Sequence, residues 1–159
     1  MYTATRYHDF SYGHRVVGHE NKCRHLHGHN GRVHFHCRAT GLDTVGRVVD
    51  FSVIKAKLCE WLEHNWDHRF LAFEEDPLFI QLQNAYNFGT EEGAPYVHPS
   101  NIEIMDGSLV YVPFNPTAEN MAEYLVNVVG PACLKGTGVE LYKVEFEETA
   151  KCCATYTKD

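Results

Sequence analysis

Histidines at short spacing are the residues of this sequence best suited to chemistry. His27 and His29 flank Gly28, and His14 lies upstream. Residues two apart share a face of an extended chain, so His27 and His29 can reach one ion, and His14 can supply a third nitrogen. Gly28 permits close approach of another chain or a ligand. Three protein ligands on zinc leave a fourth position open, which is the catalytic pattern. The alternative is a surface histidine cluster.

The segment that holds these histidines is locally basic. Residues 14–38 contain five lysines or arginines against one acid, Glu20, and seven of the eleven histidines. The whole chain carries a net charge of −7 at pH 7, so we do not expect a nucleic-acid binder that works by bulk positive charge. A basic, histidine-rich segment in an acidic protein indicates a local site for an anion, a metal ion or both.

Strand parity separates two further histidines from the metal candidates. The face that carries His27 and His29 continues with apolar side chains. His34 and His36 fall on the other face and should point away from the metal unless a bulge intervenes. We interpret that second face as the polar, basic side of a sheet; its members are Arg32, His34, His36 and Arg38.

One carboxylate continues an apolar row. In the strand predicted over residues 138–149, Tyr142, Val144 and Phe146 share a face, and Glu148 follows on it. A carboxylate at the end of a buried row costs free energy unless it binds something. Its partner can be an arginine in a structural salt bridge, or a ligand with adjacent N–H donors.

The dipeptide Asp67-His68 follows the first predicted helix. A carboxylate that orients an imidazole is a common acid–base pair in catalysis. The same dipeptide at a helix end is also explained by a surface position or by the charge preference of a helix C-terminus.

Two helices are predicted from periodicity and caps. Asp50 can cap a helix that runs to about Asn65, since apolar residues recur on one face at three-to-four spacing. A second helix begins at Asn115-Pro116-Thr117, with residues suited to a first turn. Gly130-Pro131 should stop it.

Strands are predicted on both sides of these helices. Residues 2–14 and 30–40 should form an antiparallel pair, and 138–149 a third strand. Asp106-Gly107 lies between two apolar runs within residues 102–112, which indicates a hairpin. We interpret residues 76–114 as an elaboration that contains this hairpin. The order β-β-α-(hairpin insert)-α-β-β, with antiparallel strands, predicts one α+β domain over residues 1–159.

Composition is that of an ordinary globular chain. It has 159 residues, of which 44% are hydrophobic and 22% charged, and this excludes disordered and fibrous classes. No apolar run approaches the ~20 residues of a membrane span, and the start does not resemble a signal peptide. The six cysteines include the neighbours Cys152 and Cys153 and form no CxxC motif. We therefore expect free thiols in a cytoplasmic protein with no membrane partner.

Six ordered motifs together resemble the 6-pyruvoyltetrahydropterin synthase / 6-carboxytetrahydropterin synthase family, and they cover nearly the whole chain outside residues 76–114. The motifs are Phe10-Ser11-x-x-His14-Arg15, Cys23-x-x-x-His27-Gly28-His29, Gly46-x-Val48-Val49-Asp50-Phe51, Asp67-His68, Pro116-Thr117-Ala118-Glu119-Asn120 and Glu148-Thr149.

The resemblance implies a tunnelling fold (T-fold) that assembles as rings into a homohexamer, a dimer of trimers, with sites between subunits. The basic face of Arg32, His34, His36 and Arg38 would then line the interior of a barrel or a pore. The implied substrate is a small molecule, 7,8-dihydroneopterin triphosphate, and the implied cofactor is Zn²⁺.

The resemblance also implies roles for individual residues. His14, His27 and His29 would hold zinc, and Cys23 would be the proton-transfer group. Asp67 and His68 would form a proton relay, and Glu148 would anchor the pterin, with Thr117 and Glu119 as secondary contacts. The second threonine of the family is Ala118 here, which removes one contact.

Two outcomes share this machinery. The pyruvoyl enzymes eliminate triphosphate and rearrange the side chain, whereas the carboxy enzymes also release acetaldehyde. Three residues separate Cys23 from the His-Gly-His motif, as in the bacterial carboxy branch, so we favour that branch, which serves queuosine synthesis. The alternatives are a pyruvoyl enzyme and a binding module without turnover; retention of Cys23, Asp67, His68 and Glu148 argues against the latter.

Overall fold

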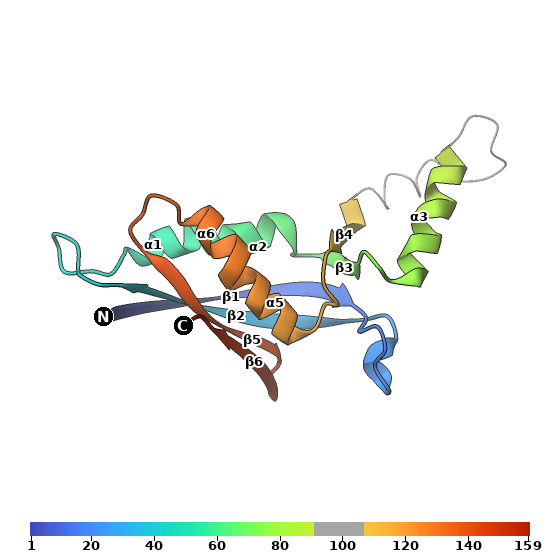
Figure 1. Cartoon of the computed structure of the whole chain (residues 1–159), viewed down its shortest axis with the longest axis horizontal. Coiled ribbons are helices and arrows are strands. Elements are labelled where there is room, and N and C mark those ends of the chain that lie inside the picture. Colours follow the sequence, from blue (N-terminus) through green and yellow to red (C-terminus); the bar gives the residue numbers. More distant parts are fainter. Residues whose placement is uncertain (91–106) are drawn as a thin grey trace.

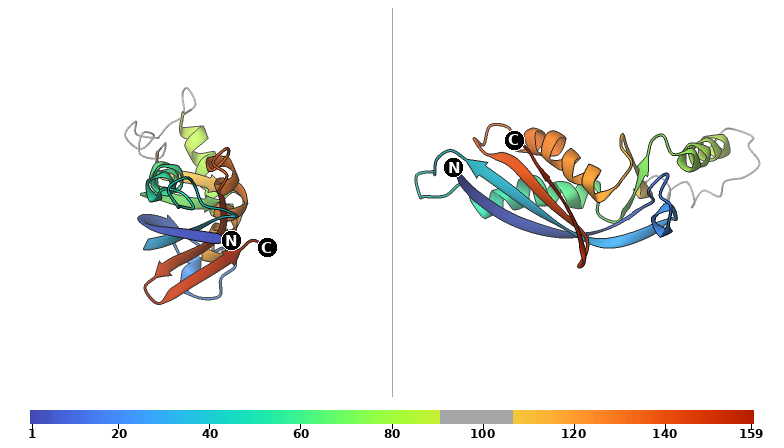
Figure 2. Two further views of the ribbon diagram at one scale, coloured as in Figure 1. Left: turned by 90° about the vertical axis from the view of Figure 1, so that its left-hand side faces the viewer. Right: turned by 60° about the horizontal axis from the view of Figure 1, so that its bottom comes forward.

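A curved six-stranded sheet with helices on one face forms the body of the protein (Figures 1 and 2). The computed structural model describes residues 1–90 and 107–159. The strand order is β4-β3-β1-β2-β5-β6. An α+β fold was predicted, and it is confirmed.

The centre of the sheet is a long antiparallel pair. β1 (Tyr2–His14) pairs with β2 (His27–Ala39) along its whole length, from Tyr2 opposite Ala39 to His14 opposite His27. β2 therefore starts three residues earlier than predicted. Gly28 makes this possible, because a Cβ there would lie 3.0 Å from the Tyr12 carbonyl oxygen across the pair.

Two strands extend the sheet beyond β2. β5 (Glu140–Thr149) pairs antiparallel with β2, and β6 (Cys152–Thr157) pairs antiparallel with β5 at the sheet edge. The register shifts between His36 and Cys37, so that Leu141 and not Tyr142 joins the buried row of Val144 and Phe146. The prediction for Tyr142 was wrong, because one extra residue in a strand reverses the face of those beyond it.

The prediction of an all-antiparallel sheet was also wrong. β3 (Arg69–Phe73) runs parallel to β1, and β4 (Leu109–Val112) runs parallel to β3. Parallel neighbours need a crossover connection, and the helices supply one before each strand. β4 corresponds to the second arm of the predicted hairpin, and it pairs with β3. The first arm and Asp106 lie outside the described residues.

A helix that the sequence patterns did not indicate lies within residues 76–114. α3 (Pro77–Thr90) begins with proline, which suits a first helical turn because it needs no N–H donor there. The Asp76 side chain accepts a hydrogen bond of 2.9 Å from the Leu78 N–H and so caps the first turn.

The first predicted helix is confirmed and contains a π-helical middle. Its parts are α1 (Phe51–Ile54), η2 (Lys55–Cys59) and α2 (Glu60–Asn65), and the Asp50 side chain accepts from the Ser52 N–H as a cap. π-helical turns inside α-helices are uncommon and often occur at functional sites.

The second helix has the same construction. It consists of α5 (Ala118–Tyr124), η3 (Leu125–Val129) and α6 (Gly130–Cys133), with Thr117 as the N-cap. Gly130-Pro131 was predicted to stop it, and it does not. The last hydrogen bond of the π turn runs from the Gly130 N–H to the Leu125 oxygen. Pro131 therefore lies in the first turn of α6, where a residue without an N–H donor is tolerated.

The two helices pack on one face of the sheet, and the core lies between them. Its sheet side comes from odd-numbered residues of β2 and from β5, and its helix side from both long helices. The largest fully buried members are Trp66, Phe35, Phe146, Ile54, Leu58, Leu62, Leu71, Met121, Leu125 and Leu141.

The other face of the sheet is polar, as parity predicts. His34 and His36 point to this side, where they contact Glu147 and Glu145. Arg32 pairs with Asp9, and Arg38 pairs with Glu140. Each cationic side chain of this face thus has an acidic partner.

Within residues 1–90 and 107–159, no helix is both long and apolar enough to cross a membrane.

Candidate active site

Three histidines converge at the end of the central strand pair. His14 is the last residue of β1 and lies opposite His27, and His29 is two residues further along β2 on the same face. One nitrogen from each ring lies within 4.8 Å of the other two. His14 is fully buried, and the other two rings are partly buried. The antiparallel register therefore assembles the cluster that the sequence predicts.

Backbone carbonyls orient two of the three rings. His14 Nδ1 lies 2.7 Å from the Pro116 oxygen, and His27 Nδ1 lies 2.7 Å from the His25 oxygen. A carbonyl only accepts, so each Nδ1 carries the proton and each Nε2 presents its lone pair to the cluster. All three Nε2 atoms are buried and have no hydrogen-bond partner in the described structure.

The arrangement fits a metal ion that prefers imidazole nitrogen. Burial lowers the pKa of His14 to about 4, helped by His27 and His29 and opposed by the Pro116 hydrogen bond. Burial likewise lowers the pKa of His29. Both rings are therefore neutral at pH 7, which is the form that ligates a metal. Carbonyl partners on Nδ1 are the usual outer contacts of metal-bound histidines.

Glu148 lies against this cluster. Its Oε1 is 3.3 Å from His14 Nε2 and 3.5 Å from His29 Nε2. The β5–β6 register shifts between Glu147 and Thr149, which leaves Glu148 without a partner residue on β6. The sequence left two partners open for this carboxylate, an arginine or a ligand. Among the described residues Glu148 forms no ion pair with an arginine, and its ion-pair contacts are to His14 and His29.

Glu148 borders a cavity of about 280 Å³ on one side of the site, and other residues predicted to be functional line the same cavity. Cys23, Thr117, Glu119 and Glu148 all line it. Cys23 comes from the short 3-10 turn η1 (Lys22–Arg24), and Thr117 and Glu119 from the start of α5. The Thr117 hydroxyl accepts a hydrogen bond of 3.1 Å from the Asn120 N–H, so this oxygen is engaged in capping the helix.

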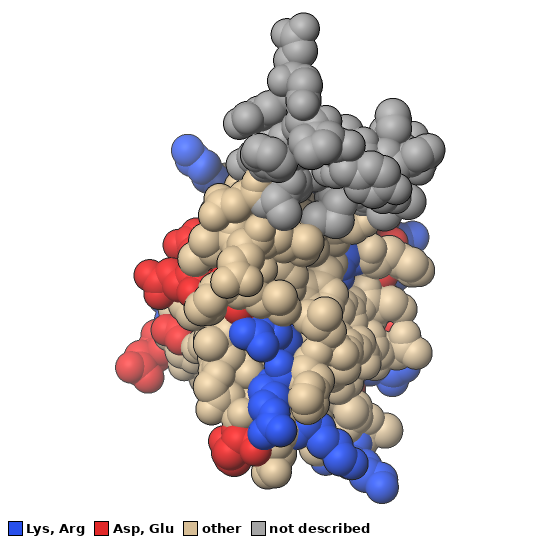
Figure 3. Space-filling model, turned by 90° about the vertical axis from the view of Figure 1, so that its right-hand side faces the viewer, with Lys and Arg blue, Asp and Glu red and all other residues tan. Residues whose placement is uncertain are grey.

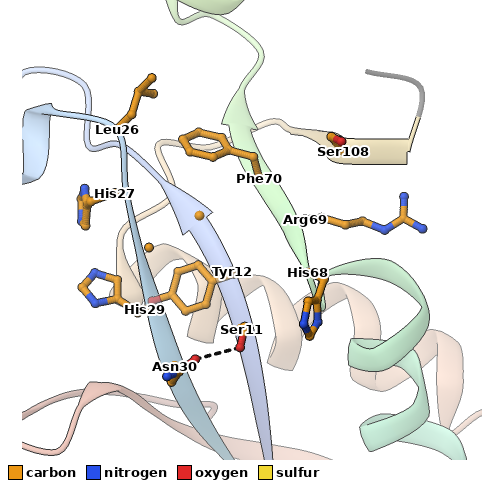
Figure 4. Close-up of a pocket in the computed structure, with 12 residues that line it drawn as sticks. Ser11, Tyr12, Leu26, His27, His29, Asn30, His68, Arg69, Phe70 and Ser108 are labelled. Carbon is orange, nitrogen blue, oxygen red and sulfur yellow. Dashed lines mark hydrogen bonds between the residues drawn. The ribbon is translucent and has the colours of Figure 1, made fainter. Parts of the chain in front are cut away.

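A second cavity, of about 710 Å³, lies on the side of β3 and is shown in Figure 4. His27, His29 and His68 line it, together with Tyr12. Two histidines of the cluster thus line this larger cavity, whereas Glu148 is the residue that links the cluster to the smaller one, and Cys23 and His68 line different cavities. The structure does not bring these two candidates into one cavity within this chain.

Asp67 and His68 form a hydrogen-bonded pair. His68 Nδ1 lies 2.7 Å from Asp67 Oδ2, and Asp67 Oδ1 accepts from the Ser11 N–H at 2.9 Å. Burial alone would raise the pKa of Asp67, but these two hydrogen bonds lower it overall. His68 has a φ of 57°, which is uncommon outside glycine, and its side chain is 80% exposed. A strained residue with an oriented, open imidazole is typical of a functional position.

Two residues near the site have roles that the sequence patterns did not reveal. Arg15 binds Asp76 through two hydrogen bonds and ties the β1 end to the start of α3. Tyr12 is buried beneath the cluster, and its hydroxyl has no hydrogen-bond partner in the described structure. Arg15 is a motif position and Tyr12 lies within the same motif, and the parity of Phe10, Tyr12 and His14 would have placed the tyrosine on the face of the histidine cluster.

Positive charge lies near the same end of the molecule. On the face shown in Figure 3, Lys and Arg side chains gather in a band over the end where β1 and β2 are connected. This connection belongs to the basic segment 14–38. A local basic surface beside the site favours an anionic ligand.

Comparisons with known proteins identify the family. A family model described as 6-pyruvoyl tetrahydropterin synthase matches residues 3–159. The chain belongs to this family. A relative from Rickettsia felis named 6-carboxy-5,6,7,8-tetrahydropterin synthase is 31% identical over 96% of this chain and 97% of its own.

Solved structures give the same family fold. An uncharacterized protein from Wolinella succinogenes superposes with a TM-score of 0.83 at 30% identity, covering 99% of this chain and 98% of that one. The 6-pyruvoyl tetrahydropterin synthase of Caenorhabditis elegans gives a TM-score of 0.63 at 23% identity over 99% of this chain and 96% of that one. The T-fold expected from the motifs is confirmed.

Proposed function

We propose that this chain is a zinc-dependent 6-carboxy-5,6,7,8-tetrahydropterin synthase built on a single T-fold domain. It would convert 7,8-dihydroneopterin triphosphate to 6-carboxytetrahydropterin with release of acetaldehyde and triphosphate, as a cytoplasmic step of queuosine synthesis. The observation that carries the proposal is the set of three buried, unpartnered Nε2 atoms in contact with Glu148, which lines the smaller cavity together with Cys23. The names of the full-length relatives support the carboxy branch.

The smaller cavity suits the pterin ring. Glu148 reaches it with a carboxylate that is 22% exposed, and a carboxylate can accept two parallel N–H bonds from an aminopyrimidinone ring. Glu119 and Thr117 border the same cavity as secondary contacts. The triphosphate would extend toward the basic segment.

The metal and Cys23 would act on the side chain of the substrate. Zinc held by His14, His27 and His29 would bind the side-chain hydroxyls and make the adjacent C–H more acidic. Cys23 would accept or return the proton from the wall of the smaller cavity. Its position on a short turn, outside the histidine cluster, fits a proton-transfer group better than a ligand.

Asp67 and His68 would supply a relay from a neighbouring subunit. Within one chain, His68 and Cys23 line different cavities, and the His68 side chain is 80% exposed. A hexamer made of two trimers would place one chain's exposed imidazole at a neighbour's cavity. Asp67 would hold the imidazole in position and stabilise its charged form.

A pyruvoyl product is the second candidate. The family is described by that activity, the Caenorhabditis elegans protein of the same fold carries its name, and the residues described above serve both reactions. Incubation of the zinc-loaded protein with 7,8-dihydroneopterin triphosphate decides between them. Acetaldehyde with a carboxylated pterin supports the proposal, and a pyruvoyl product supports the second candidate.

A chelator-treated sample provides the control for that assay. Product formation should stop without metal and return when zinc is added. Absence of turnover in the zinc-loaded protein would contradict both enzymatic candidates and leave a pterin-binding module.

A further inference from the structure

The side-chain amide of Asn115 pairs with the backbone of Val17, which lies 98 positions away in the chain. Asn115 Oδ1 accepts a hydrogen bond of 2.9 Å from the Val17 N–H, and Asn115 Nδ2 donates one of 2.9 Å to the Val17 oxygen. An amide side chain carries a carbonyl acceptor and an N–H donor side by side. One residue thus satisfies both backbone groups of Val17, as a neighbouring strand would do.

Val17 belongs to the segment that carries Cys23. This segment, residues 15–26, connects β1 to β2 and contains the short turn η1. The Val16 N–H donates a hydrogen bond of 2.7 Å to the Cys23 oxygen, so Cys23 is bonded to the residue that precedes the Asn115 contact. Val16 and Cys23 both line the smaller cavity. A shift of Val17 would therefore move this wall of the cavity and the thiol on it.

Asn115 is itself held by the start of α5. Its backbone oxygen accepts hydrogen bonds of 2.7 Å from the Thr117 N–H and 2.9 Å from Asn120 Nδ2. Thr117 is the N-cap of α5, and it lines the smaller cavity together with Glu119. The amide of Asn115 therefore joins this wall of the cavity to the one that carries Cys23.

The next residue connects the same place to the histidine cluster. The Pro116 oxygen accepts a hydrogen bond of 2.7 Å from His14 Nδ1, and His14 precedes Val17 by three residues. The chain from His14 to Val17 is thus fixed to residues 115 and 116 at both ends. Every residue type supplies a backbone carbonyl, so only the contact at Val17 depends on a side chain, that of Asn115.

We propose that Asn115 is the positioning residue of Cys23. Its amide holds the 15–26 segment so that the thiol stays on the wall of the smaller cavity, at a fixed place relative to the histidine cluster. Asn115 is not among the residues that line this cavity, and it acts through Cys23. The chemical role of Cys23 rests on the proposed function, whereas the hold that Asn115 exerts on the segment does not.

Alkylation of individual thiols tests this hold without any substrate. Asn115→Ala removes both hydrogen bonds to Val17, so the segment should open more often. Cys23, which is only partly exposed, should then react at least ~10-fold faster with iodoacetamide, as measured by peptide mass spectrometry. The rates at Cys37 and Cys59, which are buried in the core, should stay as in wild type. A general loss of stability would raise these two rates as well.

Asn127→Ala is the matched control. It removes an amide that donates a hydrogen bond of 3.0 Å to the Tyr156 hydroxyl, and neither residue lines the smaller cavity. The Cys23 rate of this variant should equal that of wild type. Equal Cys23 rates in Asn115→Ala and wild type would overturn the proposal, and so would rates that rise together at all three thiols.

Steady-state kinetics of the zinc-loaded variants test the consequence for the reaction. A misplaced Cys23 should lower kcat for 7,8-dihydroneopterin triphosphate by roughly 10²-fold. KM should change little, because the proposed pterin anchor, Glu148, is on β5. Asn115→Gln keeps the amide on a stem that is one methylene longer, so it should fold and still displace the segment, with a similar fall in kcat. Wild-type kcat in both variants would overturn the proposal, as would a rise in KM alone.

The two experiments separate this proposal from the proposed function. Faster alkylation of Cys23 in Asn115→Ala, with no turnover by wild type, would support the hold on the segment and reject the enzymatic function. Turnover by wild type, with an unchanged Cys23 rate in Asn115→Ala, would keep the function and reject the positioning role.

Discussion

The pair Arg15–Asp76 should make a large contribution to stability. Asp76 is fully buried, and Arg15 donates to it from Nε at 2.6 Å and from Nη2 at 2.8 Å. Replacement of Arg15 by Met keeps the length of the stem but leaves a buried carboxylate with only the Leu78 N–H. Removal of one partner of a buried pair costs roughly 3–5 kcal/mol. Arg15 is 24% exposed, so water can partly replace it, and we expect about 3 kcal/mol.

For a chain of this length, that loss should lower the midpoint of thermal unfolding by about 6–12 °C, at roughly 2–4 °C per kcal/mol. Arg32→Met is the matched control. Arg32 binds Asp9 with the same two-pronged geometry, at 2.7 and 3.1 Å, but the two side chains are 43% and 58% exposed. The midpoint of this variant should stay close to that of wild type.

The pH dependence of the Arg15→Met effect checks its cause. The Arg15 hydrogen bonds hold the pKa of Asp76 below its ordinary value of 3.8. A carboxyl with a depressed folded-state pKa contributes stability above its unfolded pKa and loses it as the pH falls through the folded value. The difference between wild type and Arg15→Met should be full at pH 7 and shrink below about pH 4. A difference under 1 °C at pH 7, or one that persists undiminished at pH 3, would refute this account.

Three further substitutions have defined outcomes. Cys23→Ala should lower turnover by roughly 10²-fold or more while bound zinc, measured by atomic absorption, is unchanged; loss of zinc would make Cys23 a ligand. Asp67→Asn should lower turnover by a similar factor, and a wild-type rate would remove Asp67-His68 from the mechanism. Gly130→Ala should lower the free energy of urea unfolding by about 1–2 kcal/mol, because a Cβ there would lie 2.9 Å from the Leu141 Cβ. An increase in stability would show that the packing there is looser than described.

Local rules predict the convergence of the three histidines well. Residue parity places His27 and His29 on one face, and an antiparallel partner strand that ends at His14 brings the third ring beside them. Asp50 and Thr117 cap the helices where their residue types indicate. Each of these inferences depends only on neighbours within a few residues or on one strand pair.

Features that depend on distant contacts are the ones that the sequence does not reveal. The parallel direction of β3 and β4 depends on how the helices cross the sheet. The residue pattern within these short strands does not indicate it. The bulge at Tyr142 moves one aromatic ring to the polar face, where it lies 6.4 Å from the His36 ring. Arg15 and Asp76 are 61 positions apart in the chain, and the type of neither residue indicates that the other is its partner.

The π turns η2 and η3 make both long helices tolerant of changes in length. Each holds i→i+5 bonds over five residues, which amounts to one residue more than an α-helix of the same span requires. Loss of one residue from Lys55–Cys59 would convert the turn to plain α-helix and leave the flanking faces of Ile54 and Leu62 directed at the core. Asp67 and His68, just beyond this helix, would keep their place. Deletion of a single residue from this turn should therefore leave the geometry at the helix end unchanged.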